Sequence, residues 1–391
     1  MTSNSTISSS MKYGLHVTVI WPGTPLPLLR KFCWLFFLGA FQTCQYSYVI
    51  THLKSDTLIE IVDNLSICLP YTLVFMKLCI VWTHPSLLRE ILSIMEEECR
   101  KYAALDKYNI ISKAAHLSYY LTSSAICIHV TSATFYTLGV LMPHGNATTS
   151  RKLLLKMNLP FDTNESPIYE LVVTVQIICQ TVTAYAFGFF GGLLLMVVLH
   201  VGCQIDVMCQ VLMEIPHKNK KHLRFFVSRH QEIIAFVERI EKLFTFMALS
   251  QVVSNTILIC CLGYIIVIAI QIEDGFALLI KCVVFYIGIC SELFIYCFAG
   301  EYLSIKSQLI SDTAYKFLWY NMHPNDSRIL ILVILRSQKG FTVTFGKFAS
   351  LSMENFMAVN YEICSIVCIS IARDDLKNKI HKFYSVVCHI I

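Results

Sequence analysis

The stretch that decides the fold lies near the C-terminal end and reads Glu301-Tyr302-Leu303, Ser307, Ala314-Tyr315, Trp319-Tyr320, Arg336-Ser337-Gln338-Lys339, Gly346-Lys347-Phe348, Leu351-Ser352 and Phe356. It follows a long apolar run. Aliphatic residues between Arg328 and Arg336 predict a cationic helix packed against apolar neighbours beneath a membrane, and an ordinary buried helix would give the same pattern. Gly340 and Gly346 have the backbone freedom for a turn before the last apolar run.

The composition places the chain in a membrane. Of 391 residues, 55% are hydrophobic and 15% are charged, with a mean hydropathy of +0.60. A water-soluble protein of this size carries more charge. The first ten residues are rich in serine and threonine, so we expect no cleavable signal, and the first apolar run should insert and stay.

Seven stretches are long and apolar enough to cross a hydrocarbon core of about 30 Å. The seventh is the most polar. The predicted spans are Phe32–Ile50, Leu58–Trp82, His116–Met142, Glu170–Leu199, Thr245–Ile272, Phe276–Ala299 and Leu351–Ile371.

The distribution of lysine and arginine predicts the orientation. With the N-terminus inside the cell, the inner connections hold far more lysine and arginine than the outer ones, as cytoplasmic connections usually do. The C-terminus then lies outside. This topology is opposite to that of a G-protein-coupled receptor, whose Asp-Arg-Tyr and Asn-Pro-x-x-Tyr motifs are also absent from the sequence.

The C-terminal stretch resembles the signature of insect odorant receptors. Two further matches are the pattern Arg229-His230-Gln231-Glu232-Ile233-Ile234 with Glu238-x-x-Glu241, and the outer loop Pro143–Tyr169 with its Leu159-Pro160-Phe161. The resemblance implies an all-α integral membrane protein of seven helices with a cytoplasmic helical anchor. It assigns the anchor signature to Tyr315, Trp319, Tyr320, Arg336, Ser337, Gln338, Lys339, Gly346, Lys347 and Phe348.

The expected organisation follows from these spans. The predicted parts are a cytoplasmic segment 1–31, a six-helix membrane bundle 32–299 with a cytoplasmic helical extension 205–244, an anchor region 300–350, a seventh helix 351–371 and an extracellular tail 372–391. Apolar residues from Leu223 to Met247 recur with helical period, so this polar segment should form one long helix that continues into the fifth span. His230 lies on that stripe and is interpreted as a packing residue.

The sequence contains no recognisable catalytic or metal-binding motif. Most of the 17 cysteines fall in apolar runs, no Cys-x-x-Cys pair occurs, and the histidines lack ligand spacing with them, so we expect no metal site and no cofactor. Catalytic and nucleic-acid-binding patterns are equally missing. In the fourth span, Gly188 and Gly192 form a Gly-x-x-x-Gly step that favours close helix packing over a ligand role.

Charged residues inside the spans are candidates for function, because a charge in the membrane is costly. Asp63 and Lys281 lie toward outer ends, and Lys77 lies toward an inner end, where its ammonium could reach the interface. Glu292 alone lies near mid-membrane, where it would pair across helices or line a wet cavity.

The seventh run has one face that suits a pore, polar along its inner half and aliphatic at its outer end. The predicted pore-lining residues are Asn355, Val359, Glu362, Ile366 and Ile369. Glu362 would favour cations, and an aliphatic ring would close by dewetting. A polar face that packs on other subunits, or a segment that does not span, is the alternative. The resemblance fades after about Met357, so the tail reflects either a misassembled last exon or an abnormal pore helix.

The resemblance implies an odorant-tuning subunit of a heteromeric ligand-gated cation channel, assembled as a heterotetramer with the olfactory co-receptor in the dendritic plasma membrane of sensory neurons. The expected ligand is a small volatile in the outer half of the bundle. Depth and topology suggest as its walls Pro70, Tyr71, Phe135, Tyr136, Gln176, Gln180, Phe187, Tyr264, Phe285 and Tyr286. Asn146 and Asn164 are glycosylation candidates in the outer loop. A metabotropic G-protein-coupled receptor, a gustatory-type receptor and a secondary transporter are the alternatives.

Overall fold

The computed structural model describes residues 7, 9–18, 26–102, 109–141, 153–163, 165–213, 220–271, 276–317, 320, 322–338, 340–347, 349–350, 352–354, 357–358, 361 and 365. Within them the regular secondary structure is helical except for one small β-hairpin, an addition to the all-α class expected from the sequence. The helices are α1 Ser9–Val17, α2 Pro27–His52, α3 Leu58–Thr83, α4 Pro85–Tyr102, α5 Ile110–Leu141, α6 Ile168–Met213, α7 Lys220–Gln271, α8 Phe276–Lys316 and α9 Pro324–Gln338. The strands are β1 Thr344–Phe345 and β2 Ala349–Ser350.

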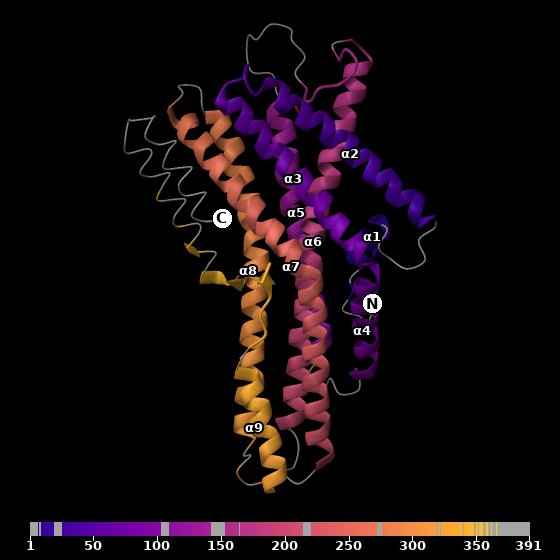
Figure 1. The fold of residues 1–391 in the computed structure, drawn as a ribbon, viewed down its shortest axis with the longest axis vertical. Coiled ribbons are helices and arrows are strands. Elements are labelled where there is room, and N and C mark those ends of the chain that lie inside the picture. Colours follow the sequence, from indigo (N-terminus) through magenta and orange to yellow (C-terminus); the bar gives the residue numbers. More distant parts are fainter. Residues whose placement is uncertain are drawn as a thin grey trace.

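The molecule is elongated along α6, α7 and α8 (Figure 1). We call the end where α3 and α6 begin the upper end, and the end that carries α9 the lower end. These three helices contain 46, 52 and 41 residues, which corresponds to roughly 60–80 Å at 1.5 Å per residue. A hydrocarbon core is about 30 Å thick, so each helix extends well beyond one membrane thickness.

Among the described residues, five helices are long and apolar enough to cross a membrane: α3, α5, α6, α7 and α8. They contain the predicted second to sixth spans. The predicted first span falls within α2, which does not reach the same apolarity, and most of the predicted seventh span lies outside the described residues.

The apolar stripe predicted between Leu223 and Met247 is the buried face of α7. Leu223, Phe226, Ile233 and Met247 are all buried on this one continuous helix. His230 is buried with them and its ring contacts Phe341, with centroids 6.4 Å apart. It is therefore a packing residue, although its Nε2 has no hydrogen-bond partner among the described residues.

The segment after α9 turns back onto α7. Gly340 and Gly346 have φ of 68° and 61°, a left-handed conformation that glycine adopts without strain, so the turn expected here is confirmed. The Gly346 N–H donates to the Thr245 carbonyl at 3.3 Å, and the Thr344 hydroxyl donates to the Glu241 carboxylate at 2.8 Å. The β-hairpin is thereby attached to the middle of α7.

An ionic cluster ties α4 to α6 and α7 in the lower half. Glu98 accepts hydrogen bonds from Arg229 Nη1 at 2.5 Å and from Gln204, and its second oxygen lies 3.2 Å from His200 Nε2. The Arg229 guanidinium also lies 4.3 Å from the centre of the Tyr102 ring. Burial alone would raise the pKa of Glu98, but the hydrogen bonds from His200 and Arg229 outweigh burial and lower it.

The Gly-x-x-x-Gly step lets α6 approach α5 at backbone distance, in the most extensive helix–helix contact of the bundle. A Cβ atom on Gly188 would lie 2.5 Å from the Ile126 Cα, and one on Gly192 would lie 2.5 Å from the Thr122 Cγ2. Thr122 donates a hydrogen bond to the Gly192 carbonyl at 3.5 Å. The packing role predicted for this step is confirmed.

We expect Gly188→Ala to lower the melting temperature of the purified protein, because the added methyl meets backbone that cannot rotate away. Overpacking of this kind costs about 1–3 kcal/mol. Gly39→Ala on α2 is the control, since nothing lies within 4 Å of its Cβ position. Equal melting temperatures for the two variants in thermal unfolding would contradict the close α5–α6 contact.

We expect Glu98→Gln to destabilise the protein at neutral pH. Because the folded-state pKa of Glu98 is lowered from its ordinary value of 4.5, its carboxylate stabilises the fold above that pH and loses this contribution as the pH falls through the folded-state pKa. Thermal unfolding from pH 7 to pH 3 should show a gap between the two proteins that stays constant down to about pH 4.5 and narrows below it. The exposed neighbour Glu97 is the control, and a Glu97→Gln variant with the same gap would rule out the cluster as the cause.

Candidate functional site: a cavity in the upper half of the bundle

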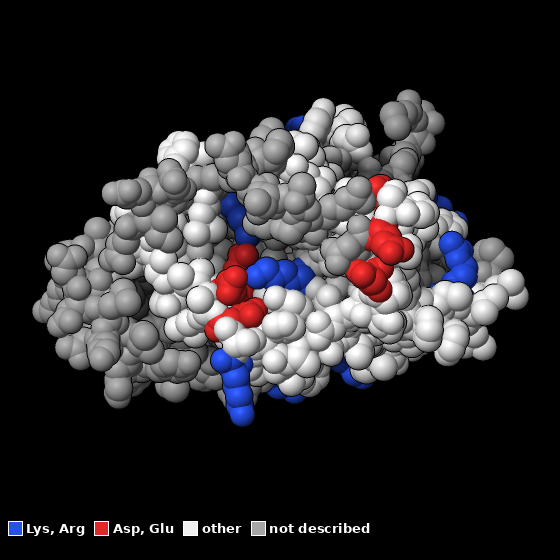
Figure 2. All heavy atoms as spheres, turned by 90° about the horizontal axis from the view of Figure 1, so that it is seen from above, with Lys and Arg blue, Asp and Glu red and all other residues white. Residues whose placement is uncertain are grey.

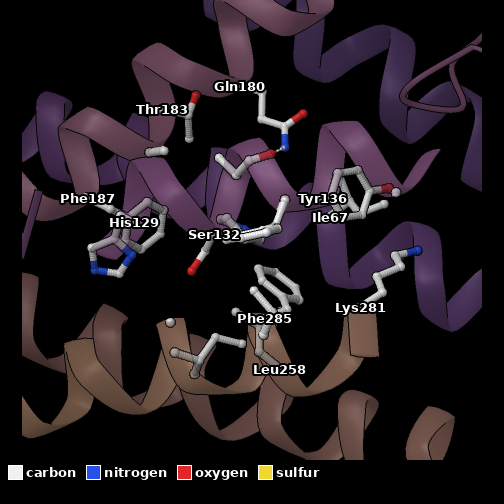
Figure 3. A pocket seen from close by; sticks show the side chains of 18 of the residues that line it. Ile67, His129, Ser132, Tyr136, Gln180, Thr183, Phe187, Leu258, Lys281 and Phe285 are labelled. Carbon is white, nitrogen blue, oxygen red and sulfur yellow. Dashed lines mark hydrogen bonds between the residues drawn. The ribbon is translucent and has the colours of Figure 1, made fainter. Parts of the chain in front are cut away.

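A cavity of about 610 Å³ lies between α3, α5, α6, α7 and α8. Figure 3 shows Gln180, Thr183 and Phe187 facing Leu258 and Phe285 across it. Most of its lining is aliphatic or aromatic, the usual lining of a site that buries a small organic molecule. An apolar ligand in it would gain about 25 cal/mol for each Å² removed from water.

The wall residues predicted from depth divide into two groups. Seven of them line the cavity: Pro70, Tyr71, Phe135, Tyr136, Gln180, Phe187 and Phe285. Gln176, Tyr264 and Tyr286 do not line it. Gln176 instead exchanges hydrogen bonds with the backbone of Leu155, at 2.9 and 3.2 Å, and so holds the segment 153–163 against α6.

Hydrogen bonds fix the α5–α6 wall. The Gln180 amide donates to the Ala133 carbonyl at 3.0 Å and accepts from the Thr137 hydroxyl at 3.4 Å. Its polar end is thus occupied by α5, and it offers the cavity mainly its stem.

An ion pair stands at the upper end of the cavity. Lys281 donates to both oxygens of Asp63, at 2.8 and 3.0 Å, and its ammonium lies 4.8 Å from the centre of the Tyr136 ring. Seen from above, acidic and basic side chains gather near the centre of the upper end (Figure 2). A second pair there joins Lys156 to Glu60 at 3.5 Å. Charged groups therefore lie at the upper end, above a mostly apolar chamber.

The lower end of the cavity is polar and fully buried. Glu292 Oε1 lies 3.0 Å from His129 Nε2, and both side chains line the cavity. The alignment of these two atoms does not make a hydrogen bond. Asn255 lines the same cavity and accepts a hydrogen bond from Gln251 at 2.9 Å. Sequence reasoning singled out Glu292, but it missed His129 and Asn255, whose only signal was polarity inside an apolar run.

The position of Lys77 differs from the expectation that its ammonium reaches the membrane interface. Its side chain is 0% exposed and does not reach an interface. The ammonium lies between the rings of Phe187, Phe190 and Tyr296, at 5.2, 5.7 and 5.4 Å from their centres. It is also near enough to Glu292 for the two charges to interact. The rings and the carboxylate together hold the cation inside the bundle, which is why it does not extend to water.

The described signature residues of α8 and α9 lie at the lower end, and Gly346 and Lys347 lie at the hairpin beside the middle of α7. Tyr315, Tyr320, Arg336, Gln338 and Lys347 are exposed, Ser337 is buried and donates to the Val333 carbonyl at 2.8 Å, and Gly346 binds Thr245. Several predicted residues lie outside the described part of the chain. They are Trp319, Lys339, Phe348, the pore-lining set Asn355, Val359, Glu362, Ile366 and Ile369, and the glycosylation candidates Asn146 and Asn164.

Comparison with known proteins gives the family. The family model described as 7tm odorant receptor matches residues 57–360, well over half of the chain. The chain belongs to the insect odorant receptor family. It is a multi-pass membrane protein, and its family is one of odorant receptors rather than of enzymes. The family match does not favour the G-protein-coupled alternative.

The receptor is also similar to individual relatives. It is 24% identical to odorant receptor 82a of Drosophila melanogaster over 59% of this chain and 60% of that protein, and 24% identical to odorant receptor 22c of the same fly over 46% and 48%. The matches thus span about half to three fifths of these relatives. The fold is that of the olfactory receptor OR5 from Machilis hrabei, with a TM-score of 0.73, 14% identity, and coverage of 92% of this chain and 96% of that one.

Within the described residues the receptor shows no group of three or more histidine, cysteine or acidic side chains arranged to hold a metal ion. Most of the cysteines that the structure describes are buried. Such thiols pack as small apolar side chains.

We expect Lys77 and Glu292 to depend on each other for stability. Lys77→Met and Glu292→Gln should each lower the melting temperature, since removing either charge leaves the opposite charge buried without compensation. The double variant should lose less than the sum of the two losses. Lys281→Met with Asp63→Asn, at the partly exposed upper pair, is the matched control and should shift stability by less than about 1 kcal/mol. Additive losses for Lys77 and Glu292 would show that the two charges are not coupled.

Proposed function

We propose that the receptor is the odorant-tuning subunit of a ligand-gated cation channel in the dendritic plasma membrane of olfactory neurons. The observation that carries this proposal is the cavity of about 610 Å³, which is apolar along most of its wall and lies between five helices. A small volatile fits such a space. The structural neighbour OR5 from Machilis hrabei has also been solved in complex with eugenol, with a TM-score of 0.73 to this chain.

The orientation we propose has the N-terminus inside the cell and the C-terminus outside. The upper end, with the cavity, then faces the exterior, and the lower half of α6, α7 and α8 projects into the cytoplasm with α9. The excess of lysine and arginine in the inner connections supports it. An odorant arriving from outside would reach the cavity past the Lys281–Asp63 pair.

Assembly with the olfactory co-receptor as a heterotetramer is supported by an apolar surface at the lower end. Leu332 and Leu335 on α9 are 65% and 56% exposed, while Leu330 and Val333 on the same helix are buried. Below the membrane, such a surface has no lipid to cover it, and contiguous apolar patches in water commonly mark protein contacts. This subunit would line its part of the pore with Asn355, Val359, Glu362, Ile366 and Ile369 of the last apolar run.

Helix α8 provides a mechanical connection between ligand and anchor. It carries Phe285 and Glu292 in the cavity and continues without interruption to Lys316, beside α9. A ligand that displaces the upper part of α8 therefore also displaces its lower end, which contacts the anchor helix α9. To gate, the ligand must bind the open arrangement better than the closed one.

The deciding experiment measures current in cells that express this chain, the co-receptor, or both, during exposure to a panel of volatile esters, ketones, alcohols and phenols. We expect odorant-evoked cation current that requires this chain, with responses selective among the volatiles. An N-terminal tag should be accessible only after permeabilisation. Current that depends on G proteins would support the metabotropic alternative, and substrate uptake without current would support a transporter.

We expect Phe285→Ala to raise the half-maximal concentration of an activating volatile by roughly 10- to 100-fold, since a buried aromatic contact contributes about 1.5–3 kcal/mol. Phe294→Ala is the control on the same helix, because that ring is 43% exposed and does not line the cavity. Dose–response currents measure both variants. Equal shifts for the two would place the odorant elsewhere.

A further inference from the structure

The Glu292 carboxylate presents unused hydrogen-bond acceptors to the cavity. The side chain is 1% exposed and lines the cavity. Oε1 faces His129 without the alignment of a hydrogen bond, and Oε2 accepts no hydrogen bond from any described residue. A buried carboxylate in this state is strongly unfavourable unless a donor reaches it. Because Glu292 lines the cavity, a ligand in the cavity can supply this donor.

A hydrogen-bond donor lies on the neighbouring helix. The Asn255 Nδ2 donates to no described residue, and Asn255 is 1% exposed in the cavity lining. Glu292 is sixteen residues beyond the start of α8 at Phe276, and Asn255 is sixteen residues before the end of α7 at Gln271. Helices α7 and α8 lie side by side and run in opposite directions (Figure 1), and both residues line the same cavity. The lower end of the cavity therefore offers an acceptor and a donor together.

The charge balance at this level selects a neutral ligand group. Lys77 is fully buried and interacts with Glu292, so the two opposite charges offset each other. An ammonium ligand would add a net positive charge inside the apolar bundle, which is costly. A hydroxyl group is neutral, donates one hydrogen bond and accepts another, and so satisfies both kinds of group.

We propose that Glu292 and Asn255 form a hydrogen-bonding subsite for the hydroxyl group of a volatile alcohol or phenol, an inference that rests on the proposed odorant function of the cavity. The hydroxyl donates its proton to the Glu292 carboxylate and accepts from the Asn255 amide. The hydrocarbon body lies upward along Phe187 and Phe285. An ether or ester of the same size cannot donate, and leaves the carboxylate without a partner.

The test uses isomeric pairs that differ only in the hydroxyl: 1-hexanol against methyl pentyl ether, and benzyl alcohol against anisole. The thermal shift of the purified full-length receptor is titrated with each compound. We expect the alcohols to act at concentrations about tenfold lower than the ethers, which corresponds to one hydrogen bond to a charged group. Ethers that act at the same concentration as their isomeric alcohols would overturn the subsite, as would the absence of a shift with all four compounds.

Variants separate the subsite from general stability. The double variant Lys77→Met with Glu292→Leu removes both buried charges together and should bind alcohol and ether alike. The matched control removes the ion pair between Lys306 and Asp206, 2.6 Å apart in the lower half, by Lys306→Met with Asp206→Asn, and should keep the preference for alcohols. A preference that survives the loss of Glu292 would overturn the assignment. If the double variant does not fold, Asn255→Leu takes its place, and an undiminished preference in that variant has the same meaning.

The experiments distinguish an error in the hydroxyl subsite from an error in the proposed channel function. If other volatiles open the channel while alcohols show no advantage over ethers, the subsite is wrong and the channel function stands. If alcohols stabilise the receptor preferentially but no volatile evokes current with the co-receptor, the subsite stands and the channel function is wrong.

Discussion

The thickness of the membrane is the constraint on which the rest of this receptor depends. Inside lipid a backbone must satisfy its own hydrogen bonds, so the spans are helices. Three of those helices, α6, α7 and α8, are about twice as long as the hydrocarbon core requires. The surplus length divides the molecule into an upper half, which holds the cavity, and a lower half stabilised by the Glu98–Arg229 cluster and by α9. Because α6, α7 and α8 are continuous through both halves, a displacement of these helices in one half is transmitted to the other.

Different interactions stabilise the helix packing within each half. In the upper half, glycines let α6 lie against α5 at backbone distance, and van der Waals contact replaces the hydrophobic effect that lipid cannot supply. In the lower half, pairs such as Lys306–Asp206 and Arg229–Glu98 cross between helices.

Periodicity and hydropathy predicted the helices because lipid and packing impose the same pattern over many residues. The stripe from Leu223 to Met247 and the Gly188–Gly192 step were both assigned correctly from spacing alone. The sequence predicted how deep in the membrane the cavity lies, but not which side chains at that depth line it. Gln176 and Gln180 lie one turn apart on α6, yet one binds the backbone of Leu155 and the other that of Ala133. Lys77 could not be placed from sequence, because its location depends on three rings and a carboxylate from other parts of the chain.

The polar lower end of the cavity bears on gating as well as on affinity. Apolar contacts are non-directional, so a volatile held by them alone gains nearly the same free energy in two slightly different arrangements of the same helices. A hydrogen bond weakens steeply when its angle changes. A group bound between Glu292 on α8 and Asn255 on α7 therefore reports the relative position of these two helices far more sharply than Phe285 or Leu258 does. Since only a difference in affinity between two states moves their equilibrium, the few polar groups of this mostly apolar cavity are the ones best placed to convert occupancy into movement of α8.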